Sequence, residues 1–298
     1  MKKPRKASFV ALVAMIAIWG YSWPMMKIGL RHAHPFDFAA LRVGIGALVL
    51  FTIVIVRGRG LALTRYRMAF VVGSLQVALF VALTQFALFY GDTGRTSVLV
   101  FTMPFWMIVF AHYLLGERMR GAQWLAVALA FAGLVLIVAP WRLTSLEASA
   151  LAIAGGAVWA IAAVLSKKWP TAGADPLLFT AWQLLFGFLW LLALALTGSH
   201  GSVDWAPEFI VALVFCAVFA TGFGWWLWTY VLSHTPAGIT GLNSLGIPVI
   251  AVASSAIQLG ERPPPMELAG MLLIGLALGL LALGGLRREA RRAQTVGT

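Results

Sequence analysis

Leu115-Gly116-Glu117-Arg118 recurs unchanged as Leu259-Gly260-Glu261-Arg262, 144 residues further along the chain. A proline precedes the glycine by twelve residues in both copies. Earlier segments match at slightly shorter offsets. The matching pairs are Trp19 and Trp159, Lys27 and Lys167, Pro35 and Pro176, Phe38 and Phe179, and Gly46 and Gly187. Self-similarity at a fixed offset indicates a duplicated unit, so we expect residues 1–145 and 146–298 to be two copies of one repeat.

The composition places these repeats in a membrane. The chain has 298 residues, of which 61% are hydrophobic and 11% are charged. In soluble domains roughly a quarter of the residues are charged. Apolar runs of about 20 residues, long enough to cross a bilayer, recur along the whole chain. We predict an all-α membrane protein with ten transmembrane helices, at 8–30, 35–56, 68–90, 96–115, 121–140, 146–166, 176–197, 207–232, 238–259 and 266–286.

Basic residues set the orientation of these ten spans. With a cytoplasmic amino terminus, 16 of the 22 Lys and Arg residues fall in cytoplasmic loops and tails, as the positive-inside rule requires. Because each repeat has five spans, the second copy enters the membrane upside down relative to the first. The prediction is therefore two inverted five-helix repeats with both termini cytoplasmic, in a multi-pass protein of the bacterial inner membrane.

The rest of the composition argues against several function classes. The net charge of +12 is spread over short loops and tails, without the aromatic or polar readers of a binding face, so no nucleic-acid partner is expected. The single cysteine, Cys216, lies in an apolar run, and neither a disulfide nor a metal site is expected. The sequence has no P-loop and no cluster of catalytic side chains, so we expect neither an enzyme nor a cofactor.

Pro104 and Pro248 fall near the middles of the fourth and ninth predicted spans. A proline inside a helix removes one backbone donor and frees the carbonyl four residues earlier, here the carbonyls of Val100 and Ser244. We expect the two prolines to act as hinges and the freed carbonyls to face a neighbouring helix, a water or a substrate. A packing kink without ligand contact is the alternative.

The chain resembles the EamA-type branch of the drug/metabolite transporter superfamily over essentially its whole length. The residues that carry the resemblance are Trp19-Gly20, Arg42, Pro104 with Gly116-Glu117-Arg118, and Pro248 with Gly260-Glu261-Arg262. The resemblance implies a central cavity lined by spans 1, 3, 4, 6, 8 and 9, with spans 5 and 10 at the periphery. It also implies export of amino acids or other small metabolites. The second half departs from the pattern, with Ala160 opposite Gly20 and Gln183 opposite Arg42.

Aromatic and polar side chains on these cavity spans are candidates for substrate contact. Aromatic walls suit amphipathic organic substrates, and amides and hydroxyls in a membrane need a partner. Arg95 would bind a substrate carboxylate at the cavity mouth, or else be an ordinary boundary cation. The other candidates, for which packing or interhelical hydrogen bonding is the alternative, are Trp19, Trp23, Gln85, Trp159, Trp226, Asn243 and Ser244.

Four further charged residues are expected to be structural. Arg42 would anchor the second span through an ion pair or a carbonyl, with substrate contact as the alternative. Lys27 would extend to the membrane surface. Glu117 and Glu261 would each pair with the arginine that follows, rather than relay protons.

Together these features predict a secondary transporter, with export of amino acids or related amphipathic metabolites by alternating access through the central cavity. No Asp or Glu lies deep in a predicted span, which favours facilitated diffusion over proton coupling. A proton-coupled exporter of drugs or organic cations, a channel and a scaffold are the alternatives. The expected partners are a small-molecule substrate and the lipid bilayer, with the chain as a monomer or, through Gly275 and Gly279, a homodimer.

Overall fold

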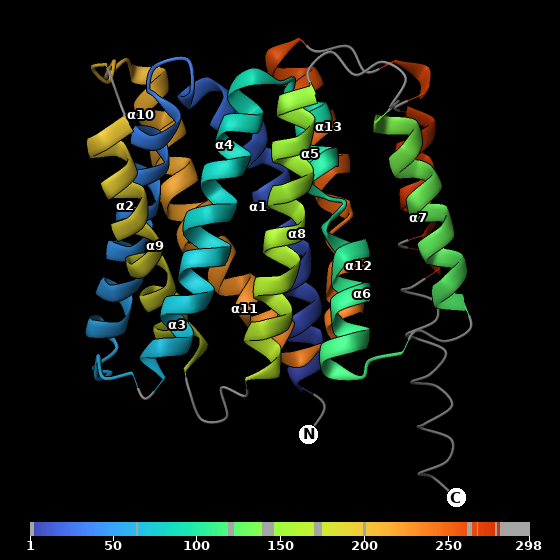
Figure 1. Cartoon of the computed structure of the whole chain (residues 1–298), viewed down its shortest axis with the longest axis horizontal. Helices are drawn as coiled ribbons and strands as arrows, with labels where there is room; N and C mark the ends of the chain where they lie inside the picture. Colours follow the sequence, from blue (N-terminus) through green and yellow to red (C-terminus); the bar gives the residue numbers. More distant parts are fainter. Residues whose placement is uncertain are drawn as a thin grey trace, which may run out of the picture.

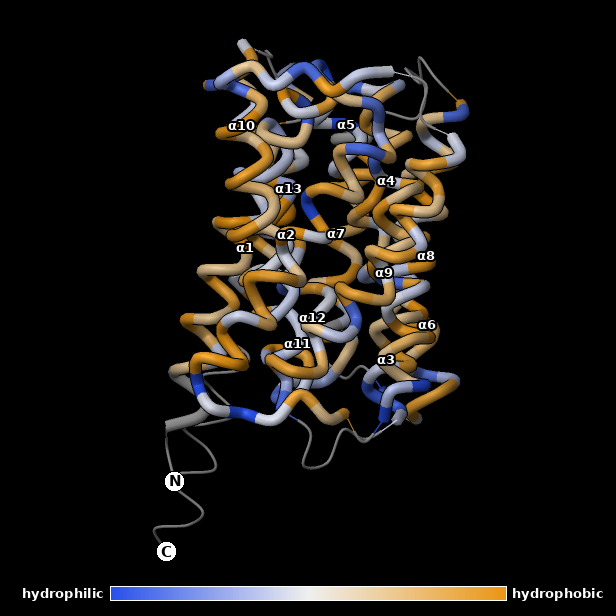
Figure 2. Tube along the Cα trace, turned by 90° about the vertical axis from the view of Figure 1, so that its left-hand side faces the viewer, coloured by the Kyte–Doolittle hydropathy of each residue, from blue (hydrophilic) through white to orange (hydrophobic). Residues whose placement is uncertain are grey.

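The computed structural model describes residues 3–63, 65–118, 122–138, 146–169, 175–198, 201–260, 264–266, 268–277 and 279–280. Every regular element in these ranges is a helix (Figure 1). Eight helices there are long and apolar enough to cross a membrane, and two shorter apolar helices, Trp124–Leu136 and Leu268–Ala277, accompany them. Hydrophobic residues fill the middle of the bundle and hydrophilic residues gather toward its two ends (Figure 2), as a lipid environment requires.

The eight long helices correspond to predicted spans 1 to 4 and 6 to 9. Four of them are single helices: α1 (Lys3–Gly29), α2 (Pro35–Val56), α8 (Leu146–Lys168) and α9 (Pro176–Gly198). The third span comprises α3 (Tyr66–Val72), η1 (Gly73–Leu79) and α4 (Phe80–Tyr90), and the eighth comprises α10 (Pro207–Val214), η3 (Phe215–Phe223) and α11 (Gly224–His234). The fourth comprises α5 (Thr93–Val100) and α6 (Met103–Leu115), and the ninth α12 (Ala237–Asn243) and α13 (Gly246–Leu259).

Predicted spans 5 and 10 correspond to the two shorter helices, and parts of both predicted ranges lie outside the described residues. The fifth is α7 (Ala122–Val138), which stands at one edge of the bundle (Figure 1). Gly133 brings it against the tenth, because a Cβ added there would lie 2.6 Å from the carbonyl oxygen of Gly270. Gly275 and Gly279 differ from Gly133, since a Cβ on either would meet no described atom within 4 Å.

The π-helical segments η1 and η3 occupy equivalent places in the two halves. They end at Leu79 and Phe223, which are 144 residues apart like the two Leu-Gly-Glu-Arg segments. Each packs against a glycine of the second span of the opposite half. Gly46 of α2 approaches Ala217 and Thr221 of η3, and Gly187 of α9 approaches Gly73 and Val77 of η1. The duplication therefore extends to backbone winding and to the contacts that cross between the halves.

Both prolines follow a helix break. The chain turns at Phe101–Thr102 between α5 and α6, and at Ser244–Leu245 between α12 and α13. The prediction of a free Ser244 carbonyl is wrong, because the backbone N–H of Ile247 donates to it at 2.9 Å. The Val100 carbonyl lies against Gly156 of α8, where an added Cβ would be 2.5 Å from the oxygen. A glycine therefore lets α8 pack directly on the first break.

Lys27 and Lys167 make equivalent contacts in the two halves. Lys27 Nζ donates to the carbonyls of Leu88 and Gly91 at the end of α4, both at 2.8 Å, so it caps the end of that helix. Lys167 Nζ donates to the carbonyls of Leu232 and Thr235 at the end of α11. A cation at the carbonyl end of a helix satisfies orphan acceptors and complements the helix dipole.

Glu117 also binds a helix end and not the arginine beside it. Its carboxylate accepts hydrogen bonds from the backbone N–H groups of Ala237 and Gly238 at the start of α12, at 3.1 and 3.2 Å. Lys167 Nζ lies 3.9 Å from the same carboxylate. Gly116, with φ of +66°, ends α6 in the left-handed conformation that glycine adopts readily. The repeated motif thus terminates one helix and places an acidic cap on another, while Glu261 lies outside the described residues.

Candidate functional site: a tryptophan-lined cavity

A cavity at the centre of the bundle contains about 460 Å³ of space between its lining atoms, a figure that includes space open to solvent. Six of the crossing spans contribute to its wall, from both halves of the chain. The lining residues are Trp19, Ser22, Trp23 and Met26 of α1, Arg42 of α2, Phe80 and Thr84 of α4, Val100 and Phe101 at the first break, Trp159 of α8, Ala220 of η3 and Trp225 of α11.

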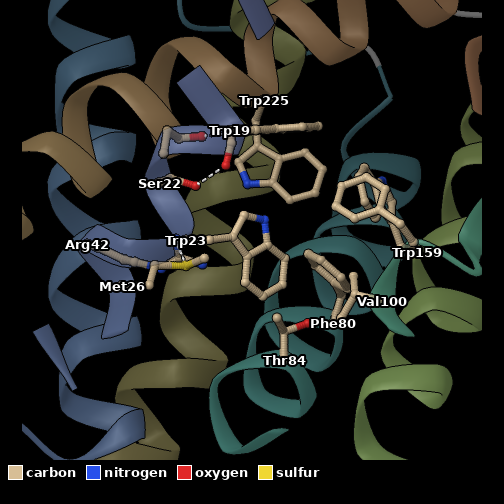
Figure 3. A pocket seen from close by; sticks show the side chains of 12 residues that line it. Trp19, Ser22, Trp23, Met26, Arg42, Phe80, Thr84, Val100, Trp159 and Trp225 are labelled. Atoms are coloured by element: carbon tan, nitrogen blue, oxygen red, sulfur yellow. Dashed lines mark hydrogen bonds between the residues drawn. The ribbon is translucent and has the colours of Figure 1, made fainter. Parts of the chain in front are cut away.

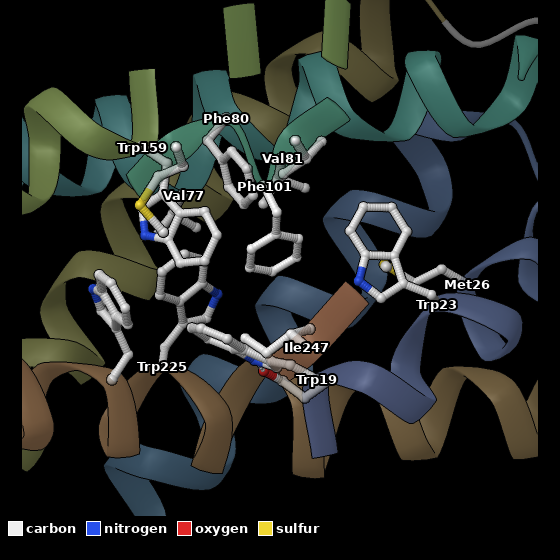
Figure 4. Close-up of a cluster of buried hydrophobic side chains, with 14 of the residues drawn as sticks. Trp19, Trp23, Met26, Val77, Phe80, Val81, Phe101, Trp159, Trp225 and Ile247 are labelled. Atoms are coloured by element: carbon white, nitrogen blue, oxygen red, sulfur yellow. Dashed lines mark hydrogen bonds between the residues drawn. The ribbon is translucent and has the colours of Figure 1, made fainter. Parts of the chain in front are cut away.

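Tryptophans from the two halves meet across this cavity (Figure 4). The ring centroid of Trp19 lies 5.4 Å from that of Trp159 and 5.0 Å from that of Trp225, both edge to face. Phe101 lies edge to face with Trp159 at 5.7 Å and with Trp23 at 6.5 Å. Such edge-to-face geometry is the favourable one for aromatic pairs. The cluster therefore joins four spans of the bundle through a wall that offers ring faces to an apolar or cationic group.

The indole of Trp19 is fixed by the π-helical segment of the other half. Its Nε1 donates to the carbonyl of Ala220 in η3 at 2.7 Å. Gly224 lies against the same ring, because an added Cβ would be only 2.2 Å from Nε1. The Nε1 atom of Trp159, by contrast, is buried without a hydrogen-bond partner among the described residues.

One end of the cavity is polar (Figure 3). Arg42 is 7% exposed and its Nη1 lies 3.4 Å from the sulfur of Met26. Gln85 Nε2 lies 3.7 Å from the same sulfur. In the described part of the chain, Arg42 Nε, Gln85 Oε1 and Thr84 Oγ1 are buried without a partner. Buried polar atoms are normally hydrogen-bonded, so three unpaired ones beside a cavity indicate a place for water or a ligand.

The structure brings only some of the predicted contact residues to this cavity. Trp19, Trp23 and Trp159 line it, and Gln85 lies beside it through Met26. Trp226 does not line it, because a step of one residue turns a helix by about 100° and the neighbouring Trp225 faces the cavity instead. Trp226 is half-buried and packs against Phe223 at 6.3 Å.

Three further predicted residues lie elsewhere. Arg95 lines a separate pocket of about 240 Å³ near the start of α5, together with Asp92 and Ser149. Ser244 donates from Oγ to the Gly241 carbonyl at 2.7 Å and so stabilises the second break. Asn243 ends α12, half-buried. Among the residues that sequence reasoning did not place at the cavity are Phe80, Thr84 and Phe101, none of which carries a sequence signal that separates it from core packing.

The described residues contain no group of three or more His, Cys, Asp or Glu side chains that could hold a metal ion. No acidic residue lies among those that line the central cavity. The site is thus aromatic, with one guanidinium and a few neutral polar groups.

The sequence matches the EamA-like transporter family twice, over residues 5–139 and 147–283. The chain belongs to the EamA-like transporter family. This confirms the predicted resemblance and shows a transporter family and not an enzyme. The uncharacterized transporter YvbV of Bacillus subtilis is 30% identical over 298 residues, covering 99% of this chain and 96% of the relative. The probable amino-acid metabolite efflux pump of Salmonella typhimurium is 28% identical, covering 96% and 98%.

A crystal structure shares the fold of this EamA-like protein. It matches with a TM-score of 0.80 at 18% identity, covering 95% of this chain and 99% of the other chain. The identity is low enough that this likeness speaks for the fold alone.

Proposed function

We propose that the protein is a secondary carrier that exports amino acids or related amphipathic metabolites by alternating access. The observation that carries the proposal is the tryptophan-lined cavity, whose walls come from both halves of the chain. In inverted-repeat carriers the substrate site lies at the interface of the repeats, so that a movement of one half against the other exposes it to either side. The relatives named as amino-acid metabolite efflux pumps support this substrate class.

The same proposal includes the topology. Residues 1–145 and 146–298 form two inverted repeats of five spans each, with both termini in the cytoplasm of a bacterium and the bundle in its inner membrane. The excess of Lys and Arg in alternate loops supports this orientation. The paired π-helical segments, helix breaks and lysine caps support the repeat.

Facilitated diffusion is the proposed mechanism. A proton-coupled carrier uses a carboxylate or histidine inside the membrane, and the cavity lining contains neither among its described residues. Aromatic walls alone would also accept an organic cation. Arg42 in the same wall disfavours one, because like charges repel at close range.

The proposal can be tested by measuring flux in proteoliposomes that contain the purified full-length protein. The labelled solutes are amino acids, organic cations and other small metabolites, each measured with and without a proton gradient. We expect saturable amino-acid flux that needs no gradient and that is accelerated by unlabelled amino acid on the opposite side. Trp159→Ala should reduce this flux by roughly tenfold or more, because it removes the ring that meets four other aromatics of the cavity.

Trp124→Ala is the matched control, since Trp124 lies on α7 and is 58% exposed on the outer surface of the bundle; it should leave the flux unchanged. Flux that does not saturate would indicate a channel. Absence of flux for the whole panel would indicate a scaffold, and dependence on the proton gradient would show coupled transport. Each of these results would overturn the proposal.

A further inference from the structure

Arg42 places a positive charge in the cavity wall without a counter-charge. Its side chain comes from α2 and lies beside Met26 and Trp23 (Figure 3). The sulfur of Met26, 3.4 Å from Nη1, is its hydrogen-bonding contact, and a thioether is only a weak acceptor. Its Nε is buried without a partner in the described chain. A guanidinium remains protonated in proteins, so the charge stays in place whether or not a ligand is bound.

The other neighbours of Arg42 do not neutralise it. Cys216 lies close enough to interact with it electrostatically, but a buried thiol is a weak and neutral polar group. Ser22 donates its hydroxyl to the Trp19 carbonyl, and Gln85 is neutral. Among the described residues, no ion pair includes Arg42. A structural ion pair, the favoured expectation for Arg42, is therefore not what these contacts show.

We propose that Arg42 binds the carboxylate of the transported solute while the tryptophans hold its apolar part. The inference rests on the proposed carrier function and names its substrate class, an amphipathic carboxylate. The planar guanidinium offers two parallel N–H donors that match two carboxylate oxygens. Thr84, whose Oγ1 is also unpaired and lines the cavity, supplies a further hydroxyl. A carboxylate at this point replaces an unpaired charge inside the membrane with a hydrogen-bonded ion pair.

The repeat adds a second argument. Gln183, at the position equivalent to Arg42, is 1% exposed and neutral. The duplication therefore gives the cavity one guanidinium and not two, which suits a solute with one carboxylate. Gln183 also supplies the natural test substitution, because the fold already holds a glutamine at the equivalent place. Arg42→Gln removes the charge and keeps a polar side chain, although a shorter one.

Competition binding on detergent-solubilised full-length protein separates the two ends of the solute. Labelled L-phenylalanine is displaced by unlabelled L-phenylalanine, by 3-phenylpropionate, which lacks the amine, or by phenethylamine, which lacks the carboxylate. Binding is measured because these small amines and acids cross bilayers unaided. For wild-type protein we expect L-phenylalanine and 3-phenylpropionate to compete at least about tenfold better than phenethylamine. The reason is that hydrogen bonds between charged groups are stronger than those between neutral groups.

Direct binding of labelled 3-phenylpropionate and labelled phenethylamine to the variants completes the test. Arg42→Gln should weaken 3-phenylpropionate by about tenfold or more and leave phenethylamine unchanged or tighter. Arg42→Lys should give an intermediate loss, because an ammonium keeps the charge but not the planar fork. Arg31→Gln is the matched control: Arg31 is exposed, just beyond α1, and its loss should change neither ligand.

The outcomes separate this inference from the carrier proposal. If all three compounds compete equally on the wild type, Arg42 does not recognise the carboxylate. Amino-acid binding and the carrier proposal would then still stand. This measurement uses wild-type protein, so it does not depend on whether a variant folds. An Arg42→Gln protein that still prefers carboxylates would overturn the role of Arg42 as well. Wild-type protein that binds none of the three compounds would overturn the amino-acid proposal together with this inference.

Discussion

Gly224→Ala tests whether the π-helical segment of one half holds a tryptophan of the other. The added Cβ would lie 2.2 Å from Nε1 of Trp19, 2.9 Å from Cδ1 and 3.0 Å from Cε2. The ring cannot yield easily, because it is hydrogen-bonded to Ala220 and packed on Trp159 and Trp225. We expect the indole to rotate and lose that hydrogen bond.

The magnitude follows from three contributions. A lost hydrogen bond removes about 1 kcal/mol of stability, and overpacking a tight site removes about 1–3 kcal/mol. Alanine in a helix returns up to about 1 kcal/mol relative to glycine. The net expectation is a destabilisation of about 2 kcal/mol, which lowers the melting temperature by about 3 °C in a chain of this length.

Thermal unfolding in detergent can be followed through Cys216, the single cysteine of the chain, which is buried and reacts with a thiol-specific dye only after unfolding. Gly275→Ala is the control, since an added Cβ there meets no described atom within 4 Å, and its melting temperature should stay or rise. Equal melting temperatures for Gly224→Ala and Gly275→Ala would refute the packing of Gly224 on Trp19.

Two further predictions concern the helix ends. Lys27→Met and Lys167→Met should each destabilise the protein by about 1–3 kcal/mol, because each leaves two helix-terminal carbonyls without their donor. Thermal unfolding measures the stability of both variants. A loss of stability in only one variant would contradict the equivalence of the two caps. Glu117→Gln should lower the stability of the protein by about 0.5–2 kcal/mol, since the start of α12 loses its charged cap. A melting temperature equal to that of the wild type would show that this cap does not contribute to stability.

The sequence was sufficient to predict the eight long spans and the family, because hydropathy and family motifs depend on many residues at once. It was not sufficient for η1 and η3. A π-helical segment changes the winding by a fraction of a turn, and residue types that pack in a membrane do so in either winding. The sequence likewise does not show that Trp225, and not the predicted Trp226, lines the cavity, because adjacent tryptophans differ only in helical phase.

Charged residues were harder to place than apolar ones. The sequence predicts that Lys27 extends to the membrane surface but does not show that it donates to Leu88 and Gly91. Arg95 was expected at the cavity mouth and lines another pocket, while Arg42 lines the central one. A linear sequence gives the depth of a charge in its span, but its partner depends on which helices lie adjacent, and that information is tertiary.

The two halves agree in backbone and differ in cavity chemistry. Both have a π-helical segment, a broken helix and a lysine cap at equivalent positions. At the cavity, however, Trp19 Nε1 is bonded to Ala220, whereas Trp159 Nε1 is unpaired in the described structure. Under the proposed alternating-access mechanism, one half moves against the other to open the cavity to either side. On that proposal, the hydrogen bond of Trp19 is a contact that would change between the two states, and a solute in the cavity would lie beside it.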